Sequence, residues 1–396
     1  MNPIATLAAV QAAADAATSA TTSATTSAAP IAAQNVDTLL STLPTSTLIY
    51  IVLLIATYAL HAIFMHYTIG GALWTLGSAI RGRFSPSTNA PRDVLAIIVR
   101  DWLPSAISSA ITAGIAPLLF VQIVYQKSFY TANLLLFNRW MLLLPALIIA
   151  IYALYVVKAH SFARGRLVKS LAAAVATVLI AYTGIAFVEN HLLSLQPAAW
   201  PAIYGGTAHG PTVERIALRF SMWLCAAMPT FALLAAWQLR LGAGNASDGD
   251  RAQSARPLAI LAVLTTIAAM GIAFVAWHVA HGESNVLASR IGLGALITLF
   301  AAQILTIPCW LTVAARRSLN GGALWILLVL SLVSIFAAAI LREAHRLALL
   351  AGTDAAPREP APVGGLAIFL IFTLLGVGII VWIVRTVARS LATRTN

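Results

Sequence analysis

Apolar runs of about 20 residues recur along the chain, and they constrain its fold more than any other feature. A run of that length is what an α-helix needs to cross the ~30 Å hydrocarbon core of a bilayer. Only 9% of the 396 residues are charged and 60% are hydrophobic, whereas soluble domains carry about 25% charged residues. We therefore expect an all-α integral membrane protein. A soluble enzyme and a nucleic-acid-binding protein are excluded, although the net charge is +12.

Nine hydrophobic spans follow an N-terminal tail. Residues 1–45 are rich in Ala, Thr and Ser and lack Lys and Arg, which predicts a disordered tail rather than a signal peptide. We expect a nine-helix transmembrane bundle over residues 46–390, a connecting loop at 85–102 with a short amphipathic turn before the second span, and a cytoplasmic tail at 391–396. The spans cover residues 46–80, 103–126, 135–157, 168–190, 215–239, 257–281, 286–314, 322–345 and 364–388. The first span is long for one crossing and is expected to protrude or tilt.

Loops that are rich in basic residues alternate with loops that are poor in them. The rich set comprises Arg81, Arg83, Arg92, Arg100, Lys158, Arg164, Arg166, Lys169, Arg240, Arg251, Arg256, Arg316, Arg317, Arg389 and Arg394. The poor set comprises Lys127, Arg215, Arg342, Arg346 and Arg358. Because cytoplasmic loops are enriched in Lys and Arg, nine spans place the N-terminus outside and the C-terminus in the cytoplasm. The positive charge is then explained by orientation and by contact with anionic lipid.

Titratable residues within spans are costly to bury and are the first candidates for function. His61 and His66 are five residues apart, or about 140° around a helix, so at most one can serve a given site. A neutral His in a span can hydrogen-bond a neighbouring helix or ligate a haem iron. Glu343 lies between Arg342 and Arg346, an arrangement that is typical of a structural ion pair at a helix end.

Other candidates carry weaker signals. His278 and His281 end the sixth span, where they could bind a metal or simply be solvated, and their role stays open like that of His66. His191 is assigned to a loop. Cys225 and Cys309 lie in apolar runs, which indicates neither disulfides nor a thiolate cluster. No CxxCH motif is present, so no covalent haem is expected on this chain.

Several short motifs occur in an order that resembles a known family. The motifs are His61 with Thr68-Ile69-Gly70, Gly114-Ile115-Ala116 leading to Gln122 and Phe129-Tyr130, Asn190 through Pro197, Arg219-Phe220, Ser289-Arg290-Ile291-Gly292, and Ile340 through Arg346. Over residues 46–390 their order and topology resemble the haem-bearing subunit (subunit I) of the cytochrome bd-type oxidase superfamily.

The resemblance implies a membrane subunit of a respiratory electron-transfer complex in a bacterial cytoplasmic membrane. It implies one non-covalent haem b, with His61 as an iron ligand and Glu343 as a partner on the second side. Arg290 and Arg346 would hold haem propionates or pair with the glutamate. Expected partners are a second, similar membrane subunit and a periplasmic cytochrome c or another redox subunit.

The chain departs from this family at several positions. Gln122 stands where the family has an acidic ligand, and it cannot supply a carboxylate to iron. The low-spin haem ligands of the family fall near Met222 and at Gly292, and a glycine has no side chain to ligate with. The loop at residues 282–286 is too short to form a quinol pocket. Quinol oxidase activity is therefore not expected, and whether oxygen is reduced stays open.

Two other functions remain open. The chain could be a haem-free scaffold that anchors peripheral redox subunits, and the lost ligands favour this alternative. The retention of His61, Glu343 and Arg346 argues against it, because buried polar groups without a role are costly. A secondary transporter is a weaker alternative, since prolines interrupt several spans but no internal repeat is evident.

Overall fold

The computed structural model describes residues 36–84, 93–159, 166–242, 246–279, 286–357 and 359–392, which contain helices and no strand. Eight helical segments among them are long and apolar enough to cross a membrane. They are α3 (Thr45–Phe84), α4 (Val94–Val124), α6 (Phe137–Met141) with α7 (Leu143–Lys158), α8 (Arg166–Ser194), α10 (Val213–Arg240), α11 (Asp248–Val279), α12 (Arg290–Arg316) and α13 (Gly321–Leu350). The all-α membrane fold expected from the sequence is confirmed at this level.

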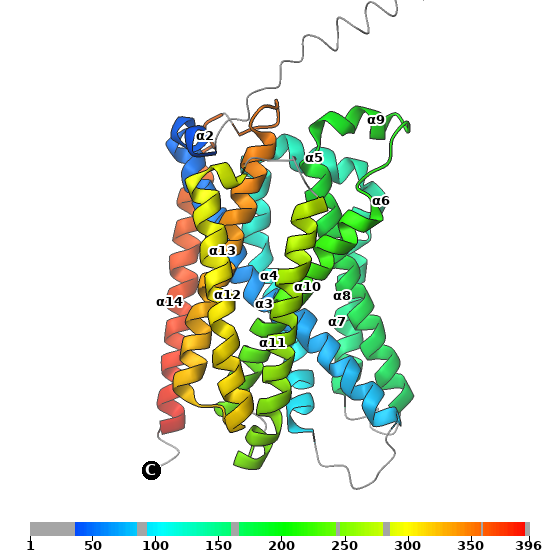
Figure 1. Cartoon of the computed structure of the whole chain (residues 1–396), viewed down its shortest axis with the longest axis vertical. Coiled ribbons are helices and arrows are strands. Elements are labelled where there is room, and N and C mark those ends of the chain that lie inside the picture. The colour runs from blue at the N-terminus through cyan, green and yellow to red at the C-terminus, as the bar shows by residue number, and fades with distance from the viewer. Residues whose placement is uncertain are drawn as a thin grey trace, which may run out of the picture.

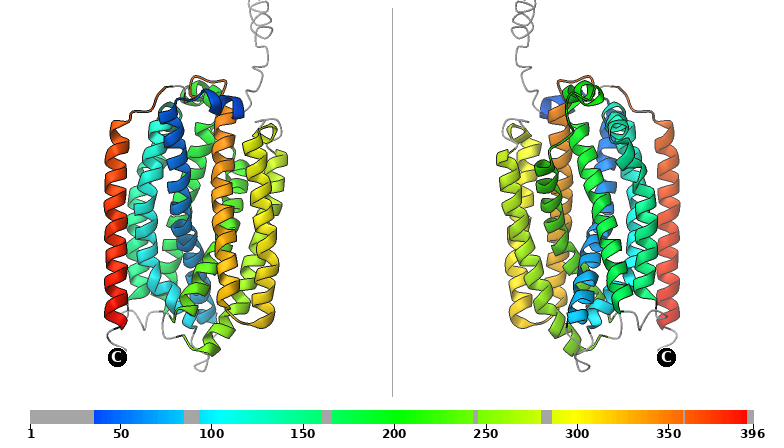
Figure 2. Two further views of the ribbon diagram at one scale, coloured as in Figure 1. Left: turned by 90° about the vertical axis from the view of Figure 1, so that its left-hand side faces the viewer. Right: turned by 90° about the vertical axis from the view of Figure 1, so that its right-hand side faces the viewer.

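A further long helix, α14 (Gly364–Ala392), coincides with the ninth expected span. Its crossing of a membrane stays a prediction, because α14 is not one of the eight segments above. Its apolar stretch Gly364–Leu375 is shorter than they are. Consecutive long helices run in opposite directions, as Figure 1 and the two side views of Figure 2 show. The short helices α2 (Val36–Thr42), α5 (Gln126–Leu135) and α9 (Trp200–Tyr204) gather at one end of the bundle, together with the turns η2 (Pro197–Ala199) and η4 (Val286–Ala288). We call this the α9 end, and the opposite end, where the described chain stops, the C-terminal end.

Helix α3 has 40 residues and is therefore about 60 Å long. It crosses the bundle obliquely (Figure 1), as its length led us to expect. Two glycines allow this close crossing. A Cβ at Gly70 would lie 2.5 Å from Cβ of Phe231 on α10, and a Cβ at Gly71 would lie 2.8 Å from Cδ2 of Leu103 on α4.

Two predicted boundaries were wrong. The tail does not continue to residue 45, because Val36–Thr42 is helical; residues 1–35 lie outside the described residues. The loop predicted at 85–102 ends earlier, because α4 begins at Val94, where the carboxylate of Asp93 accepts a hydrogen bond from the Ala96 N–H at 2.9 Å. Such an N-cap satisfies a helix terminus that hydropathy alone cannot locate.

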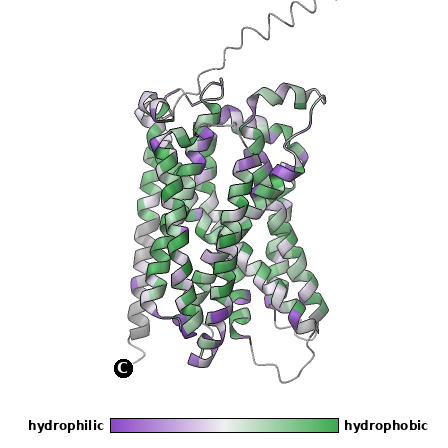
Figure 3. Ribbon diagram, viewed as in Figure 1, coloured by the Kyte–Doolittle hydropathy of each residue, from purple (hydrophilic) through white to green (hydrophobic). Residues whose placement is uncertain are grey.

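Hydrophobic residues line the length of the helices, whereas hydrophilic residues gather toward the ends (Figure 3). Large apolar side chains remain exposed along the spans, including Leu144 at 68% and Phe372 at 69%. A bilayer would cover such surfaces. The interior contains two main apolar clusters, one centred on Phe231 between α3 and α10, and one at the α9 end around Tyr50, Phe120 and Leu347.

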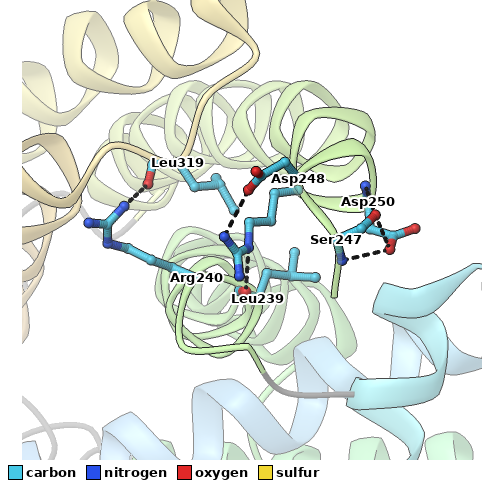
Figure 4. Close-up of polar contacts among 7 residues, drawn as sticks. Leu239, Arg240, Ser247, Asp248, Asp250 and Leu319 are labelled. Atoms are coloured by element: carbon cyan, nitrogen blue, oxygen red, sulfur yellow. Dashed lines mark hydrogen bonds and ion pairs between the residues drawn. The ribbon is translucent and has the colours of Figure 1, made fainter. Parts of the chain in front are cut away.

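Basic residues at the C-terminal end also close the connections between helices (Figure 4). Arg240 donates to the carbonyl of Leu319 at 2.8 Å, and Arg251 donates to the carbonyl of Leu239 at 3.2 Å and to Asp248 at 2.9 Å. Arg240 thereby holds the connection before α13, and Arg251 adds a second donor to the Leu239 carbonyl, which already accepts from the Gly242 N–H at 3.2 Å.

Candidate functional site

His61 lies on α3 and is held against α4. Its Nδ1 is 2.9 Å from the carbonyl oxygen of Ala110. A carbonyl only accepts, so Nδ1 carries the proton and Nε2 carries the lone pair. Nε2 makes no hydrogen bond to any described residue. The ring rests on Gly114, where an added Cβ would lie 2.9 Å from Cε1 and 3.0 Å from Nδ1 of the imidazole.

His66 has a different environment. Its side chain is buried, and Nδ1 lies 3.3 Å from the hydroxyl of Thr230 on α10. Both histidines therefore contact a neighbouring helix. Of the two, only His61 combines a backbone carbonyl partner with a glycine-lined cradle. That arrangement is how metal-ligating histidines are commonly oriented, with the second ring nitrogen donating to a carbonyl or carboxylate.

A cluster of polar side chains lies near the α9 end of α13. Glu343 and Arg346 form an ion pair at 3.2 Å, and both side chains are buried. The guanidinium of Arg346 also lies over the ring of Tyr125, 4.7 Å from its centroid. Within the described chain, Oε1 of Glu343 and the hydroxyl of Tyr125 have no hydrogen-bond partner. The Tyr125 hydroxyl is close enough to the Glu343 carboxylate to interact with it, so the two groups belong to one cluster.

His191 on α8 lies between two guanidinium groups. Its Nδ1 is 3.3 Å from Nη2 of Arg346, and its Nε2 is 3.1 Å from Nη2 of Arg219 on α10. A neutral imidazole has only one acceptor nitrogen. One of the two guanidiniums therefore faces an N–H group, so His191 cannot accept a hydrogen bond from both arginines.

Arg342 connects this cluster to His61. Its guanidinium lies over the ring of Tyr58 on α3, 4.4 Å from the centroid. Tyr58 precedes His61 by one helical turn, and His61 is within electrostatic range of Arg342. Helices α3 and α13 are thus joined here by stacked and charged side chains. No contact joins Glu343 directly to His61 among the described residues.

The charges of the cluster do not balance. Three guanidiniums, those of Arg219, Arg342 and Arg346, lie near one carboxylate, that of Glu343. The nearby pair of Glu189 and Arg139 is separate, since its members neutralise each other. Uncompensated charge in a membrane-embedded site is expensive. The arrangement can therefore hold acidic groups, and carboxylates match guanidinium donors well.

Two other predicted site residues lie elsewhere. Arg290 is exposed at the start of α12, where its backbone N–H donates to Asp37 at 2.8 Å, so the structure does not bring it to Glu343. Gln122 accepts a hydrogen bond from the exposed hydroxyl of Tyr130 at 3.4 Å. It lies eight residues beyond Gly114 on α4, or about 12 Å along the helix from the His61 cradle.

The remaining candidates do not assemble into a metal centre. His278 is exposed, with Nδ1 2.8 Å from the carbonyl of Phe274 one turn earlier. His281 lies outside the described residues. Within the described ranges, no group of three or more His, Cys, Asp and Glu side chains could hold a metal ion. An axial haem site needs fewer protein ligands, so this finding does not bear on His61.

Gly292 has a structural reason of its own. A Cβ there would lie 2.1 Å from the carbonyl oxygen of Val286, so the turn from η4 into α12 requires a glycine.

Sequence reasoning missed the contribution of His191 and gave Tyr58 and Tyr125 no role. His191 was assigned to a loop, but it is buried within α8. The polar run at residues 189–191 lowers the local hydropathy, which moved the predicted end of the span. A signal was present, because Asn190 and Glu189 would also need partners if they were buried. The structure supplies those partners as Asn133, 2.5 Å from the Asn190 amide, and Arg139.

Comparison with known proteins gives no further constraint: no family model and no curated protein matches this chain.

Proposed function

We propose that this chain is a membrane subunit of a respiratory electron-transfer complex and binds one haem b through His61. The observation that carries the proposal is the orientation of the imidazole. Its Nδ1–H is donated to the Ala110 carbonyl, which leaves the Nε2 lone pair for iron. Gly114 gives the ring its room. The alternative role of His61, a contact between helices, explains the hydrogen bond of Nδ1 but gives Nε2 no role.

The polar cluster fits the acidic groups of such a cofactor. A haem b has two propionates, and Arg219, Arg342 and Arg346 would supply the donors that hold them. Glu343 would serve the second side or fix Arg346, with which it forms the 3.2 Å ion pair. The bound haem would supply one-electron transfer. The chain would contribute the imidazole, the positive field and a site shielded from water by α3, α4 and α13.

The finer topology belongs to the same proposal. With α14 as the ninth crossing, the loops rich in basic residues lie at the C-terminal end of the bundle. That end then faces the cytoplasm, and the α9 end faces outward. The polar cluster then lies on the outer side, where a periplasmic cytochrome c could deliver electrons. A second, similar membrane subunit and a bacterial cytoplasmic membrane complete the expectation, which rests on the family resemblance.

A second candidate function is a haem-free scaffold that anchors peripheral redox subunits. Gln122 favours it, because the position of the family's acidic ligand holds a neutral amide far from the His61 cradle. In this case the arginine cluster would act only in helix packing.

Haem content separates the two functions. We would purify the complex from membranes, record a reduced-minus-oxidised spectrum and type the haem as its pyridine adduct. The proposal expects haem b on this chain, lost in His61→Ala and retained in His66→Ala, a matched control five residues away on the same helix. Haem that persists in His61→Ala would refute the ligand assignment. A wild-type chain without haem would support the scaffold.

A further inference from the structure

A groove of about 540 Å³ lies between α12 and α13 on the surface of the bundle. Its lining comes from matching positions of the two antiparallel helices, residues 290, 291, 294, 295 and 298 of α12 and residues 332, 333, 336, 337 and 340 of α13. Because these positions are three or four residues apart, they form one continuous stripe along each helix. Eight residues separate the ends of each stripe, so the groove follows the helices for about 12 Å.

Small side chains make the hollow. Ala295 and Ala337 form its buried floor, and Gly294 opens it further, because a Cβ there would meet no atom within 4 Å. Ile291 and Phe336 are about two-fifths exposed, at 41% and 42%. The surface is therefore apolar, and it lies within helices that are long and apolar enough to cross a membrane.

The groove has a cation at one end only. Arg290 lines it at the α9 end, where α12 begins. Its backbone N–H is held by Asp37, whereas its guanidinium makes no hydrogen bond or ion pair with a residue of the described chain. The other lining residues are uncharged. A charged end and an apolar shaft match a molecule with an anionic head and a hydrocarbon chain.

We propose that this groove binds an anionic phospholipid, with one acyl chain between α12 and α13 and the headgroup phosphate on Arg290. The bilayer surrounds this surface and supplies the ligand at high local concentration. A basic residue at the membrane surface attracts anionic lipid, and a guanidinium pairs well with phosphate. The site does not depend on a haem.

The test compares phosphatidylglycerol with phosphatidylcholine of the same acyl chains. The full chain is placed in nanodiscs of mixed composition, and the lipids retained after release are counted by native mass spectrometry. The wild type is expected to retain phosphatidylglycerol about fivefold over phosphatidylcholine, the factor that corresponds to about 1 kcal/mol per basic residue. Arg290→Gln should lose this preference. The matched control is Arg316→Gln, which removes an exposed cation from the other end of the same helix and should keep it.

The acyl-chain part of the proposal needs its own variant. Gly294→Leu fills the groove where the structure has open space, so the variant should fold and should lose the retained lipid of either headgroup. Equal retention of both lipids by the wild type would overturn the proposal. Equal losses in Arg290→Gln and Arg316→Gln would also overturn it, because they would indicate general attraction. A cysteine introduced as Gly294→Cys can also be cross-linked in membranes to whatever occupies the groove. A cross-link to a protein chain rather than to lipid would overturn the proposal and assign the groove to a partner protein.

Discussion

Replacing Gly114 by alanine tests the geometry of the His61 cradle directly. The new Cβ would lie 2.9 Å from Cε1 and 3.0 Å from Nδ1 of the imidazole, closer than carbon and nitrogen atoms normally approach. The ring must therefore move away from α4. That movement lengthens or breaks the 2.9 Å hydrogen bond to Ala110.

The expected magnitude follows from three effects. Overpacking a tight contact costs about 1–3 kcal/mol, and a lost hydrogen bond costs about 1 kcal/mol. Alanine regains about 1 kcal/mol because it favours the helix over glycine. Gly114→Ala should therefore lower the free energy of unfolding by about 1–3 kcal/mol in the wild type. In a His61→Ala background the clash is absent, so the same change should stabilise the protein by about 1 kcal/mol.

The assay is a double-mutant cycle on the unfolding of the purified protein in detergent. The four proteins are wild type, each single variant and the double variant. A coupling of about 2–4 kcal/mol between the two positions is expected, well above the ~0.5 kcal/mol within which independent sites add. Additive effects would refute the packing of His61 on Gly114. If haem is bound, Gly114→Ala should also lower its occupancy.

Three further predictions concern the ion pairs and the topology. Arg346→Leu should destabilise the protein by about 3–5 kcal/mol, because it leaves the buried Glu343 carboxylate without its ion-pair partner. Adding Glu343→Gln should recover part of this loss of stability in thermal unfolding. If nothing is recovered, the two residues act separately. The hydrogen bond from Lys127 lowers the pKa of Asp354. The pair therefore stabilises the protein above the unfolded carboxyl pKa of about 3.9, and this contribution is lost as the pH falls through the lower folded value. The difference in melting temperature between wild type and Asp354→Asn should shrink in that pH range, and a constant difference would contradict the prediction. A green fluorescent protein fused to the C-terminus should fluoresce and an alkaline phosphatase fusion should be inactive; the reverse result would contradict the proposed orientation.

Much of the fold could be predicted from the sequence, because a bilayer imposes a simple length rule on apolar runs. The runs identified eight segments that the structure shows as long apolar helices. The helix ends were less predictable. Helix α4 begins at Val94, before the expected span, because the Asp93 carboxylate caps it and polar residues such as Arg100 and Asp101 continue it outside the apolar stretch.

The candidate site was predictable only where its contacts are local. Glu343 and Arg346 are three residues apart, and their pairing follows from helical spacing alone. The contact of His191 with Arg346 spans 155 positions. It depends on how α8 and α13 are rotated about their axes, which hydropathy does not specify. Arg290 shows the converse, since a motif placed it near Glu343 whereas the start of α12 turns it to the surface.

Charge balance is the property of the cluster that weighs most between the two proposed functions. A scaffold needs helices that pack, and apolar side chains pack at lower cost than buried ion pairs do. This chain instead places three guanidiniums beside one carboxylate, and sets a single imidazole between two of them. Such an arrangement is costly unless acidic groups join it. An acid-bearing ligand would repay that cost, whereas a partner docked on the outer surface would not reach the buried Arg346. The unbalanced cluster therefore supports the haem-binding subunit over the scaffold.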